Sequence, residues 1–240
     1  MKIISFRRCF LVTTLLLFSG WCSAGISLGG TRLVFEAPNK EASIMVKNGG
    51  GQDVMIQSWL EAGTPQEKGD IPFVITPSLS RLGGGKQQVL RILYYGEGLP
   101  TDRESVFWLN VQEIPQKAKV DNTLQIAVRQ RIKMFYRPSG LKQGAEDVQK
   151  NLKWRVLGQG AQARLEVVND SAYYVSFGKI TLRSGSNTYE VVPEMLAPYK
   201  TSVFKINALD GKFSAAATQV EFKTINDYGG VISQKSGLSK

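Results

Sequence analysis

The chain has 240 residues, a formal net charge of +10 and no histidine. The absence of histidine excludes Ser-His-Asp and Cys-His catalysis and every histidine-ligated metal site. The basic charge is compatible with a nucleic-acid partner, but no basic cluster is interleaved with aromatic residues, so we expect a solvated basic surface and no nucleic-acid binding.

Residues 1–24 have the pattern of a secretory signal peptide. A basic start that includes Arg7 and Arg8 precedes an apolar run over residues 9–18 and a small-residue end. The run is too short to span a bilayer, so we expect cleavage after Ala24 and no membrane anchor. Cleavage removes both cysteines and three positive charges and leaves about 216 residues with a formal charge of +7 and no possible disulfide.

Short alternating segments then follow one another, separated by Gly, Pro, Asn and Asp. Short strands at this spacing are typical of a β-sandwich. The predicted strands of the first half cover residues 31–36, 42–48, 53–60, 71–77, 87–95, 105–114 and a segment that begins at 124. Pro72 and Pro77 confine the fourth of these strands to a sheet edge or an irregular path.

A second group of strands begins after residues 138–147, whose Pro, Gly and polar residues predict a linker. Its predicted strands cover residues 152–156, 163–169, 173–182, 188–193, 202–206 and 218–225. No amphipathic pattern of helical period is long enough for a helix of about ten residues. We therefore expect an all-β protein with an N-terminal domain over residues 25–140 and a C-terminal domain over residues 141–240.

Two short motifs resemble parts of enzymes. Ser176 and Lys179 match the S-x-x-K of Ser-Lys enzymes, but that pair needs a helical turn, and a strand is predicted here. Residues 83–86, GGGK, lack the following Ser or Thr and the helix of a phosphate loop. We therefore expect no enzymatic activity, no metal and no cofactor.

The segment LQIAVRQRIKMFYRP, residues 124–138, places Leu124, Ile126 and Val128 on one side of an extended chain. The alternation alone favours packing of these three side chains in the protein's own core. The alternative is an edge strand that presents them to another chain.

Several motifs in order resemble the PapD-like periplasmic chaperones of the chaperone–usher pilus pathway. The two longest are DRESVFWLNVQEIP (102–115) and the segment at 124–138. Shorter matches are GTRLVFE (30–36), IQSWL (56–60), TPSLSRL (76–82), YYVSF (173–177) and INDYGG (225–230). The resemblance covers nearly all of the chain after residue 24. It implies two immunoglobulin-like sandwiches set in an L with a cleft between them.

The resemblance also implies a function and a binding site. A protein of this family binds pilus subunits, both pilins and adhesins, in the periplasm, prevents their premature polymerisation and delivers them to the outer-membrane usher. Leu124, Ile126 and Val128 would fill the groove of a subunit that lacks its last strand, by donor-strand complementation. Arg32 and Lys133 would bind the C-terminal carboxylate of that subunit.

Three further expectations follow from the resemblance. Glu104, Arg137 and Asp227 would link the two domains through their charges. The connection at residues 115–123 is short and lacks cysteine, as in the short-loop branch of the family. Self-association of the free protein through its apolar row stays open.

A pilin or adhesin is the structural alternative. Pilins are usually shorter and often carry a disulfide, whereas this chain has two predicted domains and no cysteine after residue 24. Stable incorporation into purified fibres would favour that alternative.

Overall fold

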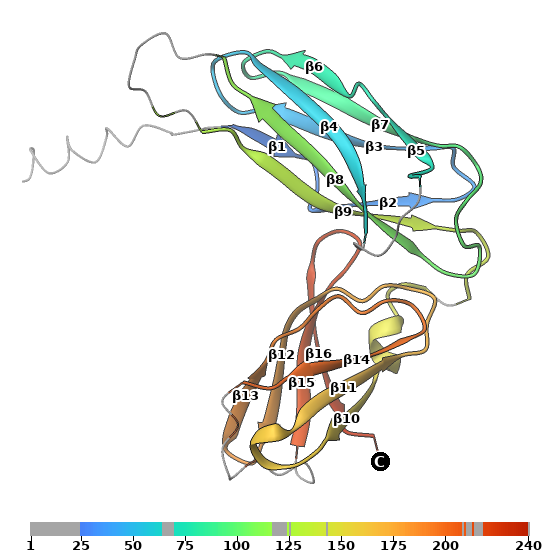
Figure 1. Cartoon of the computed structure of the whole chain (residues 1–240), viewed down its shortest axis with the longest axis vertical. Coiled ribbons are helices and arrows are strands. Elements are labelled where there is room, and N and C mark those ends of the chain that lie inside the picture. The colour runs from blue at the N-terminus through green and yellow to red at the C-terminus, as the bar shows by residue number, and fades with distance from the viewer. Residues whose placement is uncertain are drawn as a thin grey trace, which may run out of the picture.

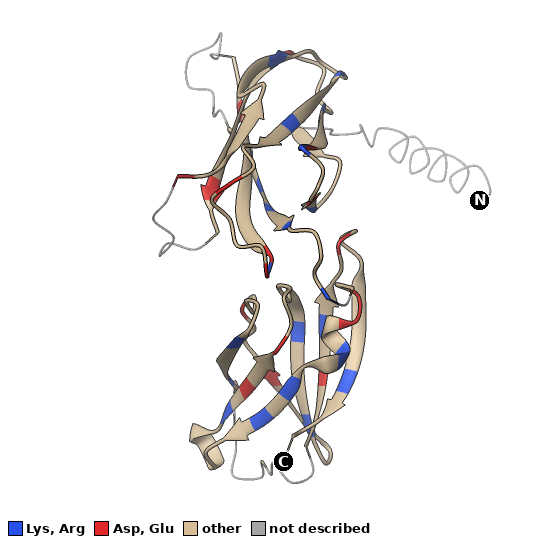
Figure 2. Ribbon diagram, turned by 90° about the vertical axis from the view of Figure 1, so that its right-hand side faces the viewer, with Lys and Arg blue, Asp and Glu red and all other residues tan. Residues whose placement is uncertain are grey.

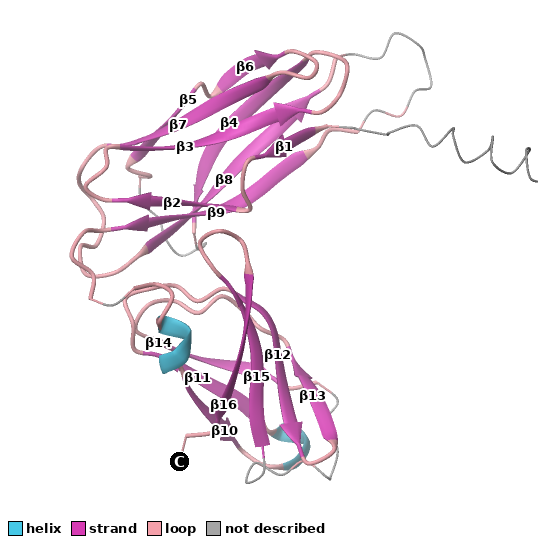
Figure 3. Ribbon diagram, turned by 180° about the vertical axis from the view of Figure 1, so that it is seen from behind, coloured by secondary structure: helices cyan, strands magenta, loops and turns pink. Residues whose placement is uncertain are grey.

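The computed structural model describes residues 25–63, 70–116, 124, 126–142, 144–207, 209, 213 and 218–239. The expected signal peptide and residues 117–123 of the short connection lie outside this part. Figure 3 shows that the described residues are almost entirely strands and loops, with two short 3-10 helices, η1 (Val148–Asn151) and η2 (Gly160–Gln162). Among them, no helix has the length and apolar character needed to cross a membrane. The predicted all-β fold is confirmed.

Two sheets form the N-terminal sandwich. Its strands are β1 (Ile26–Leu28), β2 (Arg32–Glu36), β3 (Glu41–Asn48), β4 (Val54–Ala62), β5 (Phe73–Thr76), β6 (Leu79–Leu82), β7 (Gln87–Tyr94), β8 (Ser105–Ile114) and β9 (Arg129–Arg137). One sheet has the order β1-β3-β7-β5 and the other the order β2-β9-β8-β4-β6. Their facing sides bury side chains such as Phe35, Leu90 and Leu109. The edge position of β5 agrees with the prediction from its two flanking prolines.

The first extended segment of this domain is divided between the two sheets. β1 pairs with β3 in one sheet, whereas β2 pairs in parallel with β9 in the other, from Arg32–Lys133 to Glu36–Arg137. β9 also pairs with β8, beginning at Arg129. On the side of β2, residues 129–132 of β9 therefore have no strand partner among the described residues.

The C-terminal sandwich has its own core. Its strands are β10 (Lys153–Leu157), β11 (Arg164–Asn169), β12 (Phe177–Ser184), β13 (Asn187–Val191), β14 (Lys200–Lys205), β15 (Thr218–Ile225) and β16 (Val231–Gly237). They form sheets of order β10-β11-β14 and β13-β12-β15-β16. One core extends to Tyr136 and the other begins at Val148, while Leu141 and Ala145 of the predicted linker pack on the second core. The domain boundary between residues 140 and 141 stays a prediction.

The structure differs from the predicted strands at several places. β1, β6 and β16 were not predicted. The strand predicted from residue 124 begins at Arg129, where pairing with β8 begins. The strand predicted from residue 173 begins at Phe177, because the residues before it bond to the N-terminal domain: Glu104 N donates to Ala172 O at 2.8 Å, and Tyr174 N donates to Glu104 Oε2 at 2.8 Å.

A buried charge cluster joins the two domains. Figure 1 shows the sandwiches set at an angle, with the turn between β15 and β16 reaching towards β2 and β9. In this contact Arg137 Nη2 lies 2.7 Å from Glu104 Oε1, and Arg137 Nη1 lies 2.9 Å from Asp227 Oδ2. The side chain of Glu104 is only 2% exposed. The three residues predicted to link the domains are thus in direct contact.

Burial and pairing act in opposite directions on these groups. Burial raises the pKa of Glu104 above its ordinary value, and the charge of Arg137 opposes that rise. Burial alone would lower the pKa of Arg137, but its hydrogen bonds and ion pairs with Asp227 and Glu104 raise that pKa overall. Removal of Arg137 would therefore leave a buried carboxylate without a compensating charge.

Replacing Arg137 by leucine leaves the Glu104 carboxylate buried without its counter-charge. We expect the free energy of unfolding to fall by about 3–5 kcal/mol at neutral pH. Without Arg137 the pKa of Glu104 in the folded protein rises further. A carboxyl whose pKa is raised by folding adds stability at low pH and loses it as pH rises through the folded value. The loss in free energy of unfolding caused by Arg137→Leu should therefore become smaller as the pH is lowered from about 7 to about 5.

Urea unfolding of the parent and of Arg137→Leu at both pH values measures this effect. Asp227→Asn is the control, because Asp227 is one-third exposed and its loss should cost only about 1–2 kcal/mol. An equal loss in free energy of unfolding at the two pH values would contradict the assignment of Glu104 as the buried carboxylate that is left without a counter-charge.

Candidate functional site

Two basic residues lie side by side where β2 begins to pair with β9. Arg32, the first residue of β2, is in register with Lys133. Lys133 Nζ donates a hydrogen bond to Ser176 Oγ at 3.2 Å, and Arg32 Nη1 donates to the carbonyl oxygen of Ile225 at 2.9 Å. The two cations predicted to bind a carboxylate are thus adjacent, and both contact the C-terminal domain.

Neither cation forms an ion pair with a carboxylate in the described part of the chain. The interface carboxylates of Glu104 and Asp227 pair with Arg137 instead. Burial lowers the pKa of Lys133, and the charge of Arg32 lowers it further; burial also lowers the pKa of Arg32. In addition, Arg32 Nε is buried and makes no hydrogen bond with the described residues. An anion bound between these side chains would relieve their repulsion and satisfy free donors.

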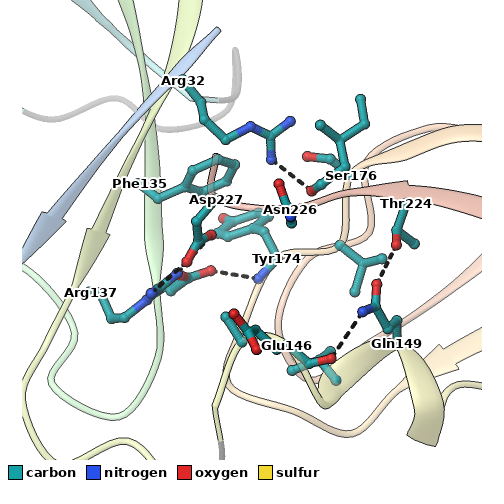
Figure 4. Close-up of a pocket in the computed structure, with 15 residues that line it drawn as sticks. Arg32, Phe135, Arg137, Glu146, Gln149, Tyr174, Ser176, Thr224, Asn226 and Asp227 are labelled. Atoms are coloured by element: carbon teal, nitrogen blue, oxygen red, sulfur yellow. Dashed lines mark hydrogen bonds and ion pairs between the residues drawn. The ribbon is translucent and has the colours of Figure 1, made fainter. Parts of the chain in front are cut away.

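A polar pocket occupies the cleft between the domains, next to Arg32. Figure 4 shows Arg32 and Arg137 entering it from the N-terminal domain, while Tyr174, Ser176 and Asp227 enter it from the C-terminal domain. The remaining lining includes Glu104, Phe135, Glu146, Gln149, Thr224, Ile225 and Asn226. The cleft is therefore lined by both domains and is closed on one side by the interdomain charge cluster.

The predicted apolar row is exposed and lies just before β9. Leu124, Ile126 and Val128 are 84%, 70% and 36% exposed, whereas Ile132, which has the same parity on β9, is 8% exposed. Packing of the three side chains in the chain's own core, which the alternation alone favoured, is therefore wrong. The row extends the core-facing side of β9 beyond the last residues that the domain itself covers.

The opposite side of β9 carries a basic and aromatic surface that sequence reasoning missed. The guanidinium carbon of Arg131 lies 4.2 Å from the ring centroid of Trp108, and Arg131 pairs with Glu61 at 3.0 Å. Lys133 Nζ lies 5.8 Å from the centroid of the same Trp108 ring. The alternating basic residues of β9 were visible in the sequence, but their partners come from β4 and β8, and only the pairing of the strands reveals them.

The enzyme-like motifs do not form catalytic arrangements. Ser176 Oγ accepts a hydrogen bond from Lys133, whereas Lys179 lies in β12 and pairs with Glu190 at 2.7 Å. The GGGK motif forms a tight turn in which the backbone N–H of Lys86 donates to the carbonyl of Gly83. No group of His, Cys, Asp and Glu suited to a metal ion occurs among the described residues.

The basic residues are spread over strands of both domains. Figure 2 shows them along the strands, several beside acidic residues. The cross-strand pair of Arg155 with Glu166, 2.6 Å apart, is an example. This distribution differs from the continuous basic surface that a nucleic-acid backbone requires.

Comparison with known proteins gives a family match for each domain. Residues 25–142 match the family of the PapD N-terminal domain, described as a pili and flagellar-assembly chaperone. Residues 147–236 match the C-terminal domain of the pili assembly chaperone PapD. The chain is 39% identical over 239 residues to the probable fimbrial chaperone YadV of Escherichia coli K12, and the alignment covers 96% of each protein.

Solved structures give the same result. The crystal structure of the YadV chaperone matches with a TM-score of 0.77 and 37% identity, over 89% of this chain and 99% of that chain. The Salmonella enterica SafA pilin in complex with the SafB chaperone gives 0.72 and 26%, over 90% and 97%. The periplasmic chaperone SfaE gives 0.67 and 32%, over 88% and 98%. The two domain matches and these full-length similarities together show that the chain belongs to the PapD-like family of pilus assembly chaperones.

Proposed function

We propose that this chaperone binds pilus subunits in the periplasm by donor-strand complementation and delivers them to an outer-membrane usher. One observation carries the proposal: in the part of the chain that the structure describes, the edge of β9 has no strand partner, continues into an exposed apolar row and ends at two cations that have no carboxylate partner. The similarity to a pilin-bound chaperone structure supports the subunit as partner. The expected signal peptide and the similarity to a periplasmic chaperone support the compartment.

The backbone of β9 supplies the first part of binding. Residues 129–132 have β8 on one side and, among the described residues, no strand on the other. An edge of this kind pairs readily with another chain, because its N–H and C=O groups lack partners. Backbone pairing is insensitive to side-chain identity, so it suits a chaperone that serves several related subunits.

The apolar row supplies the second part. Leu124, Ile126 and Val128 extend the side of β9 that carries the buried residues Ile132 and Met134. When residues 124–128 adopt β9 geometry beside a subunit, the three side chains enter its hydrophobic gap. Their burial would contribute roughly 1.5–3 kcal/mol each at best.

The cations determine the direction of the bound strand. A subunit strand that lies along residues 124–132 and ends at Lys133 must run parallel to β9. β2 is also parallel to β9 and begins opposite Lys133. The subunit strand and β2 would therefore lie end to end along β9, and the terminal carboxylate would meet Arg32 at the start of β2. This carboxylate also fixes the register, because a slip by one residue would turn the subunit's side chains to the wrong face.

The β9 edge also accounts for the proposed protection and release of subunits. A covered β9 blocks the subunit surface on which another subunit would assemble. Release proceeds by strand exchange at the usher, without enzymatic activity. In the absence of subunits, pairing of two chaperone molecules through this edge would hide the apolar row. Co-expression with candidate subunits, followed by co-purification from periplasm, tests the function as a whole.

Replacing Lys133 or Arg32 by alanine should abolish the carboxylate contact and preserve the fold. Loss of charge-assisted hydrogen bonds of about 1.5–3 kcal/mol predicts binding of a subunit weakened roughly 10- to 150-fold. Folding lowers the pKa of Lys133, so its charged form costs stability below that pKa. Lys133→Ala should therefore be no less stable than the parent at neutral pH. Titration calorimetry and thermal unfolding measure the two effects, and unchanged subunit affinity would reject the anchor.

Replacing Ile126 by aspartate tests the apolar row. Ile126 is exposed in the free protein, so the thermal transition should stay unchanged, while a buried carboxylate in the subunit groove should weaken binding at least about tenfold. Ile132→Asp is the matched control on the same side of β9, where the buried charge should unfold the N-terminal domain. An Ile126→Asp variant that unfolds like the control would show that the row belongs to the chaperone's own core.

A further inference from the structure

Both cations of the proposed anchor donate a hydrogen bond to the C-terminal domain. Lys133 and Arg32 lie on strands of the N-terminal domain, yet their side chains donate to Ser176 Oγ and to the carbonyl oxygen of Ile225. Figure 4 shows Ser176 and Arg32 at the same end of the interdomain pocket. The C-terminal domain thus supplies a hydrogen-bond acceptor to each cation.

The two acceptors are connected to each other. Ile225 N donates to the carbonyl oxygen of Ser176 at 2.9 Å. Hydrogen bonds therefore connect Lys133 to Ser176, Ser176 to Ile225 and Ile225 to Arg32. Arg32 is in turn the register partner of Lys133, so the four residues form a closed ring of contacts. A displacement of one member changes the separation of the two charges.

Ser176 is itself held firmly. Ser176 is 4% exposed, and it follows Val175, which exchanges two backbone hydrogen bonds of 2.9 Å with Leu196. Tyr174, which directly precedes Val175, donates its backbone N–H to Glu104 Oε2. The backbone of Ser176 is therefore fixed and carries the hydroxyl on a short side chain, whereas the Lys133 ammonium sits at the end of a flexible stem.

We propose that Ser176 is a positioning residue of the carboxylate anchor, which holds Lys133 Nζ beside Arg32 for the incoming subunit terminus. This inference rests on the proposed function. An ammonium group has three donors, and one bond to Ser176 leaves two for a carboxylate. Fixing the ammonium before binding removes part of the ordering cost that a free lysine would have on binding. The C-terminal domain is then part of the binding site, although the paired strand and the apolar row belong to the N-terminal domain.

The decisive experiment compares two synthetic peptides that carry the last strand of a co-purifying pilin, one ending in a carboxylate and the other in an amide. The full-length chaperone, Ser176→Ala and Ser176→Thr are titrated with each peptide by calorimetry. Ser176→Ala should weaken binding of the carboxylate peptide about three- to tenfold and leave the amide peptide unchanged. Ser176→Thr keeps the hydroxyl and should restore binding. Ser233→Ala, on the exposed side of β16, is the matched control and should change neither affinity.

The outcomes separate the inference from the proposed function. A parent protein that binds both peptides equally overturns the carboxylate anchor, and the role of Ser176 with it. A parent that prefers the carboxylate, together with a Ser176→Ala variant that keeps the full preference, overturns only the role of Ser176. Equal weakening of both peptides by Ser176→Ala also overturns it, because a general disturbance of the domain interface acts without regard to the peptide terminus.

Discussion

The division of the first extended segment between two sheets is the constraint on which the rest of the structure depends. β1 pairs with β3, and β2 joins β9 only from Arg32 onwards. If the whole segment ran along β9, that strand would have a partner on both sides and its edge would be closed. The crossing of the chain between β1 and β2 instead leaves the first part of β9 without a strand on one side, within the described part of the chain. In the proposed complex, the incomplete sheet of the chaperone would face the incomplete fold of its partner.

The position where β2 begins also places the charges. The same residue pair, Arg32 and Lys133, marks the end of the open edge and the beginning of the closed one. A strand that fills the open edge stops where β2 starts, since the two occupy one line along β9. Cations at that point are suited to a chain end and poorly suited to a chain that continues, so the proposed site would select for a terminus.

The sequence predicted the parts of the fold that depend on alternation. Strands with one buried side, such as β3 and β11, were recognised because apolar residues recur at every second position. β16 was missed because its side chains are exposed or half-buried throughout and carry no apolar period. β1 and β6 are too short to give a pattern. The start of β12 was misplaced because Tyr174 is held by Glu104, a contact with the other domain that no local pattern encodes.

Local sequence patterns were equally insufficient to assign the site residues. Alternation identified Leu124, Ile126 and Val128 as one row, but periodicity alone assigned that row to the protein's own core, and only the family resemblance gave the other assignment. Ser176 attracted attention as part of an S-x-x-K motif, and its contact is with Lys133, 43 positions away in the chain. Long-range pairing between β2 and β9, and contacts between the domains, bring the members of the proposed anchor together, so they are not neighbours in the sequence.

The binding strength of the proposed anchor would be limited by the features that make it specific for a carboxylate. Arg32 and Lys133 are partly buried and repel each other, and both effects lower the pKa of Lys133. A bound carboxylate relieves the repulsion but must leave water, so part of the Coulombic gain is lost to desolvation. Backbone pairing likewise replaces hydrogen bonds to water and gives a modest net gain for each bond. The proposed complex would be held by many small contributions along one strand. Another strand that makes the same contacts could then displace the subunit stepwise, as a transfer without an energy source requires.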